Sequence, residues 1–598
     1  MTQPAKSAAK KAAVKKSTTK IGTEKVLALR IANAPRLSSA KDAKGRLAGW
    51  LQEISRSTPG KSLKALIGNS TKLAALLCGL ADGSPFLWDL AVAEPARLLG
   101  ILQSDPDKRF AQLLLETARA VEATRDEAEA MRLLRRMKSE AALLIAIADI
   151  GGAWPVIRTT RALTELADAA VQLALRFLLR DAARRGRLKP PNPKAPEEGS
   201  GHIVLAMGKM GAYELNYSSD IDLIVFYDPE APGLADKDEA AAFHVRITRG
   251  LVKLLQERTG DGYVFRVDLR LRPDPASTQA AVSVETALNY YGSIGQNWER
   301  AAMIKARVCA GDFKAGAAIL KELQPFIWRK YHDFAAVADI EAMKRQIHAY
   351  KGHEDIAVEG HNVKLGRGGI REVEFFVQTQ QLIAGGRHPE LRGRETLPML
   401  DAMVEGGWIK KDARADLRAA YEFLRHVEHR LQMVADDQTH TLPLEREDME
   451  RFARFAGFKD RDDFAETLLG HMRKVQRHYA RLFEDAGDRP DDKKLSFPKK
   501  ADDRDTLDHL GMLGFKKPLE VSGTVRGWLE GAYPSLKGEL ARSQLGELAP
   551  VLIERLARSE NPDVAVAAFD RFLAGLHGGA RLFSLLKDRK STRLNSSH

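Results

Sequence analysis

Two aspartates stand two residues apart, Asp220 and Asp222, at the start of a short apolar segment within GKMGAYELNYSSDIDLIVFYD. Because alternate side chains of a β-strand point to the same face, both carboxylates project together if this segment is a strand. Two carboxylates held that close repel each other unless a proton or a cation lies between them. Mg²⁺ is a hard ion that favours carboxylate oxygens together with substrate phosphates. A lone pair is weak evidence, but it indicates metal-assisted phosphoryl or nucleotidyl transfer.

A third acid strengthens this interpretation. The segment YVFRVDLRLRP (263–273) alternates apolar and polar residues, which predicts a strand with Asp268 on its polar face beside Arg266, Arg270 and Arg272. Three carboxylates of this kind could hold two Mg²⁺ ions about 3.5–4 Å apart, as in-line transfer requires. The arginines on the same face would orient the acid or bind a phosphate bidentately.

A glycine-rich turn precedes the acidic pair. GKMG (208–211) follows the apolar segment HIVLAMG, a predicted strand, and its glycines would let backbone N–H groups approach a phosphate. It is not a Walker A loop, because Met210 stands where Ser or Thr is needed. Two serines before the acidic pair could hydrogen-bond a phosphate or cap the turn. The residues expected at a nucleotide-phosphate site are Gly208, Lys209, Gly211, Ser218 and Ser219.

The elements that must position these residues form an α/β unit between helical regions. Apolar residues recur at helical spacing from about 24 to 185, and again from about 285 to 485. Between them, IDLIVFY (221–227) is a predicted strand and AAAFHVRITRGLVKLLQERTG (240–260) an amphipathic helix. Segments 188–202 and 487–505 have the composition of linkers. The predicted domains are a disordered basic tail (1–23), a helical domain (24–190), a nucleotidyltransferase α/β domain (191–315), a helical bundle (316–486), a linker and helical regulatory region (487–589) and an artefactual tail (590–598).

Composition excludes several classes of protein. The chain has no run of 18 apolar residues and no secretory signal, so we expect no membrane partner. Two cysteines exclude a disulfide scaffold, which fits a reducing cytoplasm. The first 20 residues carry six lysines and no acid, so the formal charge of +13 falls to 13 − 6 = +7 without them. That remainder argues against a nucleic-acid partner, although the tail itself could bind a polyanion.

Long segments of the chain resemble one family, the bifunctional glutamine synthetase adenylyltransferase/adenylyl-removing enzymes. Besides the acidic segment, they are GYVFRVDLRLRPD, YYGSIGQNWERAAMIKARVCAG, NVKLGRGGIREVEFFVQTQQLIAGGRHPELR and VEHRLQMVADDQTHTLP, and the resemblance covers roughly residues 30 to 580. It implies a mostly α-helical protein with an inserted α/β nucleotidyltransferase domain like that of DNA polymerase β. SSDIDLIVFYD and LGRGGIREVEF look like the removing half, which uses phosphate to release ADP from an adenylylated tyrosine of glutamine synthetase.

The resemblance also implies roles for individual residues. Asp220, Asp222 and Asp268 would hold Mg²⁺. We place Trp298, Glu299, Arg300, Lys305 and Arg307 on a following helix, where Lys305 or Arg307 would contact phosphate; helix packing is the alternative. In GGIREVEFF, Glu372 or Glu374 would lie near the nucleotide or metal, unless they only complement the helix dipole. 

Other interpretations stay open. One is AMP addition from ATP, another a non-catalytic regulatory fragment, and a third a nucleic-acid nucleotidyltransferase. A PII uridylyltransferase would carry a cluster of His and Asp, of which only the dipeptide at 332–333 occurs. The family implies control by the PII signal protein. The helical pair His426 and His429 lacks further ligands, and DDQTH (436–440) is interpreted as a helix cap. The ending KSTRLNSSH resembles a sequencing-adaptor read-through, so we expect the natural protein to continue.

Overall fold

The computed structural model describes residues 26–328, 356–487, 497, 503–557, 559 and 561–576. The basic tail, the tail at 590–598, the dipeptide at 332–333 and most of the linker at 487–505 lie outside these residues. The chain folds as two compact units, Met1–Leu482 and Phe483–His598. Both consist mainly of helices, and the first also contains a small mixed sheet, which confirms the coarse fold class. The finer domain boundaries remain a prediction.

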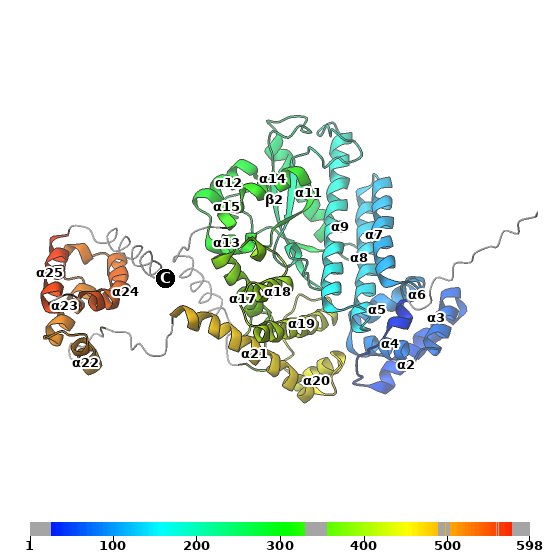
Figure 1. The fold of residues 1–598 in the computed structure, drawn as a ribbon. Coiled ribbons are helices and arrows are strands. Elements are labelled where there is room, and N and C mark those ends of the chain that lie inside the picture. Colours follow the sequence, from blue (N-terminus) through cyan, green and yellow to red (C-terminus); the bar gives the residue numbers. More distant parts are fainter. Residues whose placement is uncertain are drawn as a thin grey trace, which may run out of the picture. The chain divides into compact units, whose positions relative to one another are not determined.

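The first part of unit 1 is helical, as the apolar periodicity predicts. Its longest helices, α8 and α9, are lined with buried apolar residues, and α9 runs beside the sheet (Figure 1). Several of its helices start at a side-chain cap or with proline in the first turn, both of which favour helix initiation. The helices are α1 (Leu27–Arg30), α2 (Ala40–Glu53), α3 (Thr58–Gly68), α4 (Thr71–Gly83), α5 (Pro85–Ala93), α6 (Pro95–Leu102), α7 (Pro106–Ala123), α8 (Glu127–Ile150) and α9 (Val156–Arg184).

Within the described part of the chain, no single helix is long and apolar enough to cross a membrane. Only α3 and α4 pass such a test together, and the chain bends by 112° between them. Most of their leucines, including Leu63 and Leu76, are fully buried in the core of unit 1.

The sheet has the strand order β3-β2-β1-β5, and β4 also pairs with β2. Strand β1 is antiparallel to both β2 and β5, whereas β3 and β4 run parallel to β2. The two central strands are almost entirely buried, which explains their continuous apolar runs. The strands are β1 (His202–Ala206), β2 (Asp220–Tyr227), β3 (Arg266–Asp268), β4 (Val282–Ser283) and β5 (Arg307–Gly311).

Short helices surround this sheet, and the predicted helix at 240–260 is confirmed as α11 (Ala240–Gln256). It packs on α9 and contacts β3. The others are α10 (Gly208–Gly211), α12 (Val284–Ser293), α13 (Asn297–Met303), α14 (Phe313–Glu322) and α15 (Gln324–Ile327).

Two predictions about these elements are wrong. The alternating segment 263–273 forms a strand only over Arg266–Asp268, because the chain turns where the backbone N–H of Arg270 donates to Asp268 Oδ1 (2.8 Å). Arg270 and Arg272 therefore do not share a strand face with Asp268. Lys305 and Arg307 are not helical either, since α13 ends at Met303, Lys305 lies in the turn that follows, and Arg307 begins β5. Strand β5 escaped prediction because a five-residue segment after a helix carries little periodic signal.

The last part of unit 1 is a helical region with its own apolar core, around Leu417 and Met472. Its helix α19 contacts α9, so this region packs against the first helical region. The elements are α17 (Ile370–Ala384), α18 (Thr396–Glu405), α19 (Lys411–Met433), α20 (Arg446–Phe455) and α21 (Arg461–Gly487).

Unit 2 is a small helical body built around Trp528, which is fully buried. The indole N–H of Trp528 and the hydroxyl of Tyr533 both donate to Asp570 Oδ1, at 2.7 and 2.8 Å. Its helices are α22 (Arg504–Met512), α23 (Pro518–Glu530), α24 (Glu539–Leu556) and α25 (Pro562–Gly575).

Candidate functional site

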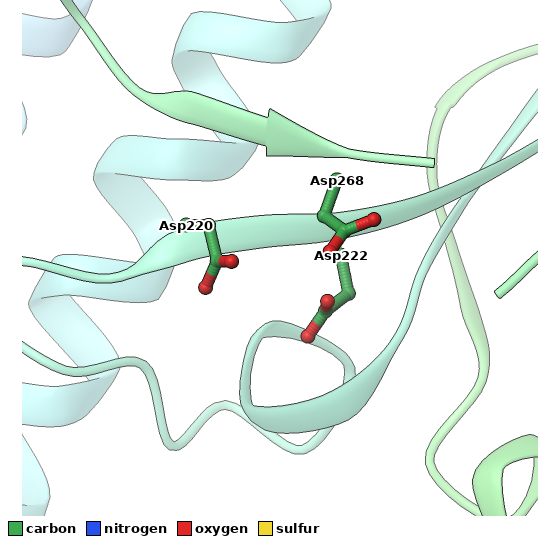
Figure 2. Close-up of side chains that lie close together, drawn as sticks. All are labelled: Asp220, Asp222 and Asp268. Atoms are coloured by element: carbon green, nitrogen blue, oxygen red, sulfur yellow. The ribbon is translucent and has the colours of Figure 1, made fainter. Parts of the chain in front are cut away.

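Three carboxylates meet where β2 and β3 run side by side. In the parallel register, Asp222 lies opposite Asp268 and Asp220 opposite Arg266. One oxygen from each of Asp220, Asp222 and Asp268 can be chosen so that all lie within 4.8 Å of one another. Figure 2 shows the three side chains gathered on these neighbouring strands. Among the described residues, no other group of His, Cys, Asp and Glu could hold a metal ion in this way.

The electrostatics of this cluster favour a bound cation. Burial, together with the charges of Asp220 and Asp268, raises the pKa of Asp222 to about 7. Asp268 behaves differently: its partial burial acts to raise its pKa, but hydrogen bonds from the Arg270 guanidinium (2.8 and 3.0 Å) outweigh it and lower the pKa. A divalent cation would relieve the repulsion at Asp222, and an all-oxygen donor set suits a hard ion. The residues present therefore fit such an ion.

The glycines of α10 let its turn approach the site. Gly208 has φ +51°, and a Cβ there would lie 2.6 Å from Asp222 Oδ2. A Cβ on Gly211 would lie only 2.1 Å from the carbonyl oxygen of Lys305. Since real Cβ contacts are not that short, both positions require glycine. The glycines thus fix the distance between α10, the acidic cluster and the turn before β5.

Lys209 of α10 is held by a buried carboxylate. Its Nζ lies 3.0 and 3.1 Å from the two oxygens of Glu428 and 3.0 Å from Asn216 Oδ1. Glu428 comes from α19 and is fully buried, with Arg425 Nε at 3.0 Å and His440 Nδ1 at 2.9 Å. Burial raises the pKa of Glu428, but these cations, Lys209 foremost, outweigh it and hold the pKa well below normal. Sequence reasoning missed Glu428, although it lies in the family segment VEHRLQM.

The segment after α19 crosses to the acidic cluster. Ser218 donates from its N–H to Gln432 Oε1 (2.9 Å) and from its hydroxyl to the Asp436 carbonyl (2.8 Å). Gln438 Nε2 donates to Asp220 Oδ1 (2.7 Å), and the Ser219 hydroxyl lies 3.4 Å from the same atom. The interpretation of DDQTH as a helix cap is wrong, because α19 already ends at Met433. Ser218 thus anchors this segment, and Gln438 orients a carboxylate of the cluster.

The remaining predicted cations have protein partners. Arg272 donates to the carbonyl oxygens of Leu269 (2.9 Å) and Thr278 (3.1 Å), which secures the loop after β3. Arg307 donates to Asp168 Oδ1 of α9 (2.7 Å) and to the Met210 carbonyl (3.1 Å). Both side chains therefore bind elements that frame the site, whereas Arg270 binds Asp268 directly.

Lys305 and the two glutamates of α17 join the sheet region to the last helical region. Lys305 Nζ is buried, 3.4 Å from Glu214 and 3.5 Å from Glu374. Burial raises the pKa of Glu374, but Lys305 and Lys209 outweigh it and lower the pKa to about 2. Glu372 is buried and accepts from the Gly368 N–H (3.0 Å), as an acid in the first turn of a helix does.

The residues on α13 have separate roles. Glu299 forms a capping box with Gln296, and Arg300 is buried and donates to the carbonyls of Ile327 and Leu382. Trp298 is 45% exposed and lines a cavity.

The predicted helical pair His426 and His429 lies near the buried Asp149 of α8, at 3.7 and 4.0 Å. Both histidines therefore take part in the packing of α8 against α19.

The cavity beside the acidic cluster has a volume of about 330 Å³, at the small end of the range of sites for small molecules. Its walls come from α10, β2, α13 and the start of α17. They include Gly208, Asp222, Trp298, Lys364, Arg371 and Phe375. The cavity thus joins an acidic cluster to cations and to flat apolar side chains, the combination that a nucleotide requires. Lys364 and Arg371 were not singled out in the sequence, although both lie in the segment KLGRGGIREVEF.

Two protein families match parts of this chain. The family described as glutamate-ammonia ligase adenylyltransferase matches residues 74–322, and the one described as GlnD PII-uridylyltransferase matches residues 339–483. A bifunctional glutamine synthetase adenylyltransferase/adenylyl-removing enzyme of Rhodopseudomonas palustris (strain HaA2) is 56% identical over 566 residues, which cover 94% of this chain and 57% of that protein. Proteins of the same name from Bradyrhizobium diazoefficiens and Xanthobacter autotrophicus are 56% and 54% identical, over 94% and 95% of this chain and 56% and 57% of their own length.

The chain therefore spans slightly more than half the length of the curated relatives it matches. The matched stretch covers nearly all of this chain, at 94% to 95% of its residues. By this similarity the chain belongs to the family of bifunctional glutamine synthetase adenylyltransferase/adenylyl-removing enzymes.

Proposed function

We propose that this chain removes AMP from an adenylylated tyrosine of glutamine synthetase, using inorganic phosphate and releasing ADP. The observation that carries the proposal is the cluster of Asp220, Asp222 and Asp268, whose Asp222 lines a cavity with cationic and aromatic walls. Removal rather than addition is supported by SSDIDLIVFYD and LGRGGIREVEF, since adding halves read closer to SDLDL and RGGITDIEF.

We further infer that residues 191–315 form a nucleotidyltransferase domain like that of DNA polymerase β. Its support is the order of elements: a strand, a glycine turn, a second strand with two aspartates, and a third aspartate on the adjacent parallel strand. The three carboxylates would hold Mg²⁺, which when bound would stabilise negative charge on the transferring phosphoryl group and the leaving oxygen.

The protein's own side chains prepare this site for an in-line displacement. Arg270 keeps Asp268 ionised, and Gln438 orients the Asp220 carboxylate. A phosphate oxygen forms a bond to the α-phosphorus while the bond from that phosphorus to the tyrosine oxygen breaks. The attacking hydrogen phosphate gives up one proton and the leaving phenolate takes up one, so the products are ADP and a free tyrosine. A phenol with pKa near 10 leaves without strong general-acid help.

The partners follow from the same proposal. Glutamine synthetase is the protein substrate that the relatives' names specify. Control by the PII signal protein is supported by the match of residues 339–483 to a family described as PII-uridylyltransferase. Neither partner has an assigned surface on this chain.

The test is incubation of adenylylated glutamine synthetase with the chain, phosphate and Mg²⁺, followed by measurement of ADP. Asp220→Asn and Asp222→Asn should each lower the rate more than about a hundredfold, since even outer partners of metal ligands contribute roughly 10- to 100-fold. Their thermal midpoints should hold or rise, because each substitution relieves carboxylate repulsion. Asp89→Asn, at an exposed position on α5, is the matched control.

Each alternative has its own result. AMP transfer from ATP to unmodified glutamine synthetase, with no ADP from the adenylylated form, would identify an adding enzyme. A folded chain with neither activity would be a regulatory fragment. Loss of ADP release in Asp89→Asn as well would point to general damage rather than to the acidic cluster.

A further inference from the structure

The side chains of two cations in the cavity wall make no ion pair and no hydrogen bond with the described residues. Four basic residues line the cavity, and two are neutralised: Lys209 by Glu428, and Lys305 by Glu214 and Glu374. For the side chains of Lys364 and Arg371, the described residues provide no ion pair and no hydrogen bond. Asp222 attracts Lys364 and Glu374 attracts Arg371 only from beyond ion-pair distance, so an anion bound between the two cations would relieve the repulsion of their like charges.

The backbone holds these two residues together. Residues 363–371 fold back on themselves, with hydrogen bonds from Ile370 N–H to the Val363 carbonyl and from Arg371 N–H to the Lys364 carbonyl, both 2.9 Å. The turn between them is tight: a Cβ on Gly369 would lie 2.7 to 2.9 Å from three carbonyl oxygens. The positions of Lys364 and Arg371 are therefore set before a ligand arrives, which lowers the entropy cost of binding.

The chemistry of the wall indicates what anion this is. A guanidinium and an ammonium together match the several oxygens of a phosphate, and the guanidinium can bind two of them at once. The cavity is half-open at this wall, since Lys364 is half-buried and Arg371 exposed. Asp222 lines the same cavity, so a phosphate here adjoins the acidic cluster.

We propose that Lys364 and Arg371 form the subsite for the phosphate that accepts the AMP group. This inference rests on the proposed function for the identity of the acceptor. The same chemistry would also suit the terminal phosphates of a nucleoside triphosphate, and the experiment separates the two sources.

The experiment measures binding directly. Inorganic phosphate, AMP and ATP are titrated separately into the full chain by calorimetry, without metal. The variants are Lys364→Gln and Arg371→Gln, with Arg371→Lys as the conservative change. Lys410→Gln, which removes one exposed cation elsewhere in unit 1, is the matched control. The Michaelis constant for phosphate in ADP release is measured alongside.

Each glutamine variant should weaken phosphate binding about tenfold or more, the usual effect of one charge-assisted contact, and leave AMP affinity within about twofold. Arg371→Lys should retain part of the affinity, and Lys410→Gln all of it. The Michaelis constant for phosphate should rise more than the turnover number falls.

Three results would overturn the subsite: phosphate that does not bind the unmodified chain, variants that leave phosphate affinity unchanged, and variants that weaken AMP as much as phosphate. If ATP affinity alone falls, the two cations hold a triphosphate and the acceptor assignment is wrong. If the variants lose phosphate binding but the unmodified chain releases no ADP, the subsite stands and the proposed function fails.

Discussion

Glu428→Gln should destabilise unit 1 more than Lys209→Met, although the two residues form one ion pair. Glu428 is the single carboxylate among three basic groups: Lys209, Arg425 and His440 all lie within 3.1 Å of its oxygens. Without its charge, two buried cations remain close together and keep only the more distant Glu374 as a shared counter-charge. Removing one partner from a buried pair costs roughly 3–5 kcal/mol. Lys209→Met instead leaves Glu428 paired with Arg425, at a cost nearer about 1–2 kcal/mol.

Thermal unfolding provides the measurement. Unit 1 ends at Leu482, and an unfolding entropy of about 2.1 cal/mol/K per residue amounts to roughly 1 kcal/mol/K for a unit of this size. Glu428→Gln should therefore lower the first thermal midpoint by about 3–5 °C, and Lys209→Met by about 1–2 °C.

The double variant gives the sharper test. Glu428→Gln leaves the Lys209 charge without its nearest counter-charge, but in the presence of Lys209→Met that charge is already absent. The double variant should therefore lose less stability than the sum of the two single losses. Strict additivity, or a larger loss from Lys209→Met alone, would refute the view that Glu428 is the shared counter-charge of this network.

Two further predictions concern packing and pH. Gly211→Ala should lower the thermal midpoint through a clash that costs roughly 1–3 kcal/mol, because its Cβ would lie 2.1 Å from the Lys305 carbonyl oxygen. The control is Gly68→Ala, whose Cβ would meet nothing within 4 Å and which should be neutral or stabilising. His202 and His244 are buried with their Nδ1 atoms 2.9 Å apart, and burial lowers their pKa values to about 3 and about 2. Below pH about 6.5 the two histidines therefore bind protons in the unfolded chain but not in the native state. The free energy of unfolding thus falls as pH falls, by up to about 2.7 kcal/mol per pH unit for two such groups. His202→Asn should shrink the slope of the thermal midpoint between pH 6.5 and 5. An unchanged slope, or the same effect from His388→Asn at a half-buried position, would contradict this.

Much of the fold could be predicted because its signals are local. The amphipathic helices, the apolar strand that carries Asp220 and Asp222, and the glycine turn are each visible within a dozen residues. The strand predicted over 263–273 was too long because apolar and polar residues keep alternating in the sequence after the strand ends at Asp268. There a local bond from the Arg270 backbone to the Asp268 side chain turns the chain, and no hydrophobic pattern reports such a bond.

The candidate site was only partly predictable for the same reason. Asp268 could be proposed from its strand context, and the structure places it opposite Asp222. Glu428 and Gln438 were missed because they lie 219 and 218 residues away from their partners in the chain, on a helix or loop whose own pattern explains them adequately. Lys305 and Arg307 were assigned to phosphate, whereas the structure pairs them with carboxylates of other elements.

By itself, the sequence determined the residue types that can perform phosphoryl chemistry, the helical character of most of the chain, and the family. These depend on side-chain identity and on periodicity, which are local properties. Only the tertiary structure decided which charges are neutralised and which remain available. Lys209 and Lys305 form ion pairs with buried glutamates, while Lys364 and Arg371 face the cavity and form none with the described residues. The physical reason is that a charge acts through distance and burial. Folding sets both, because it brings glutamates of α19 and α17 against Lys209 of α10 and Lys305 of the turn before β5.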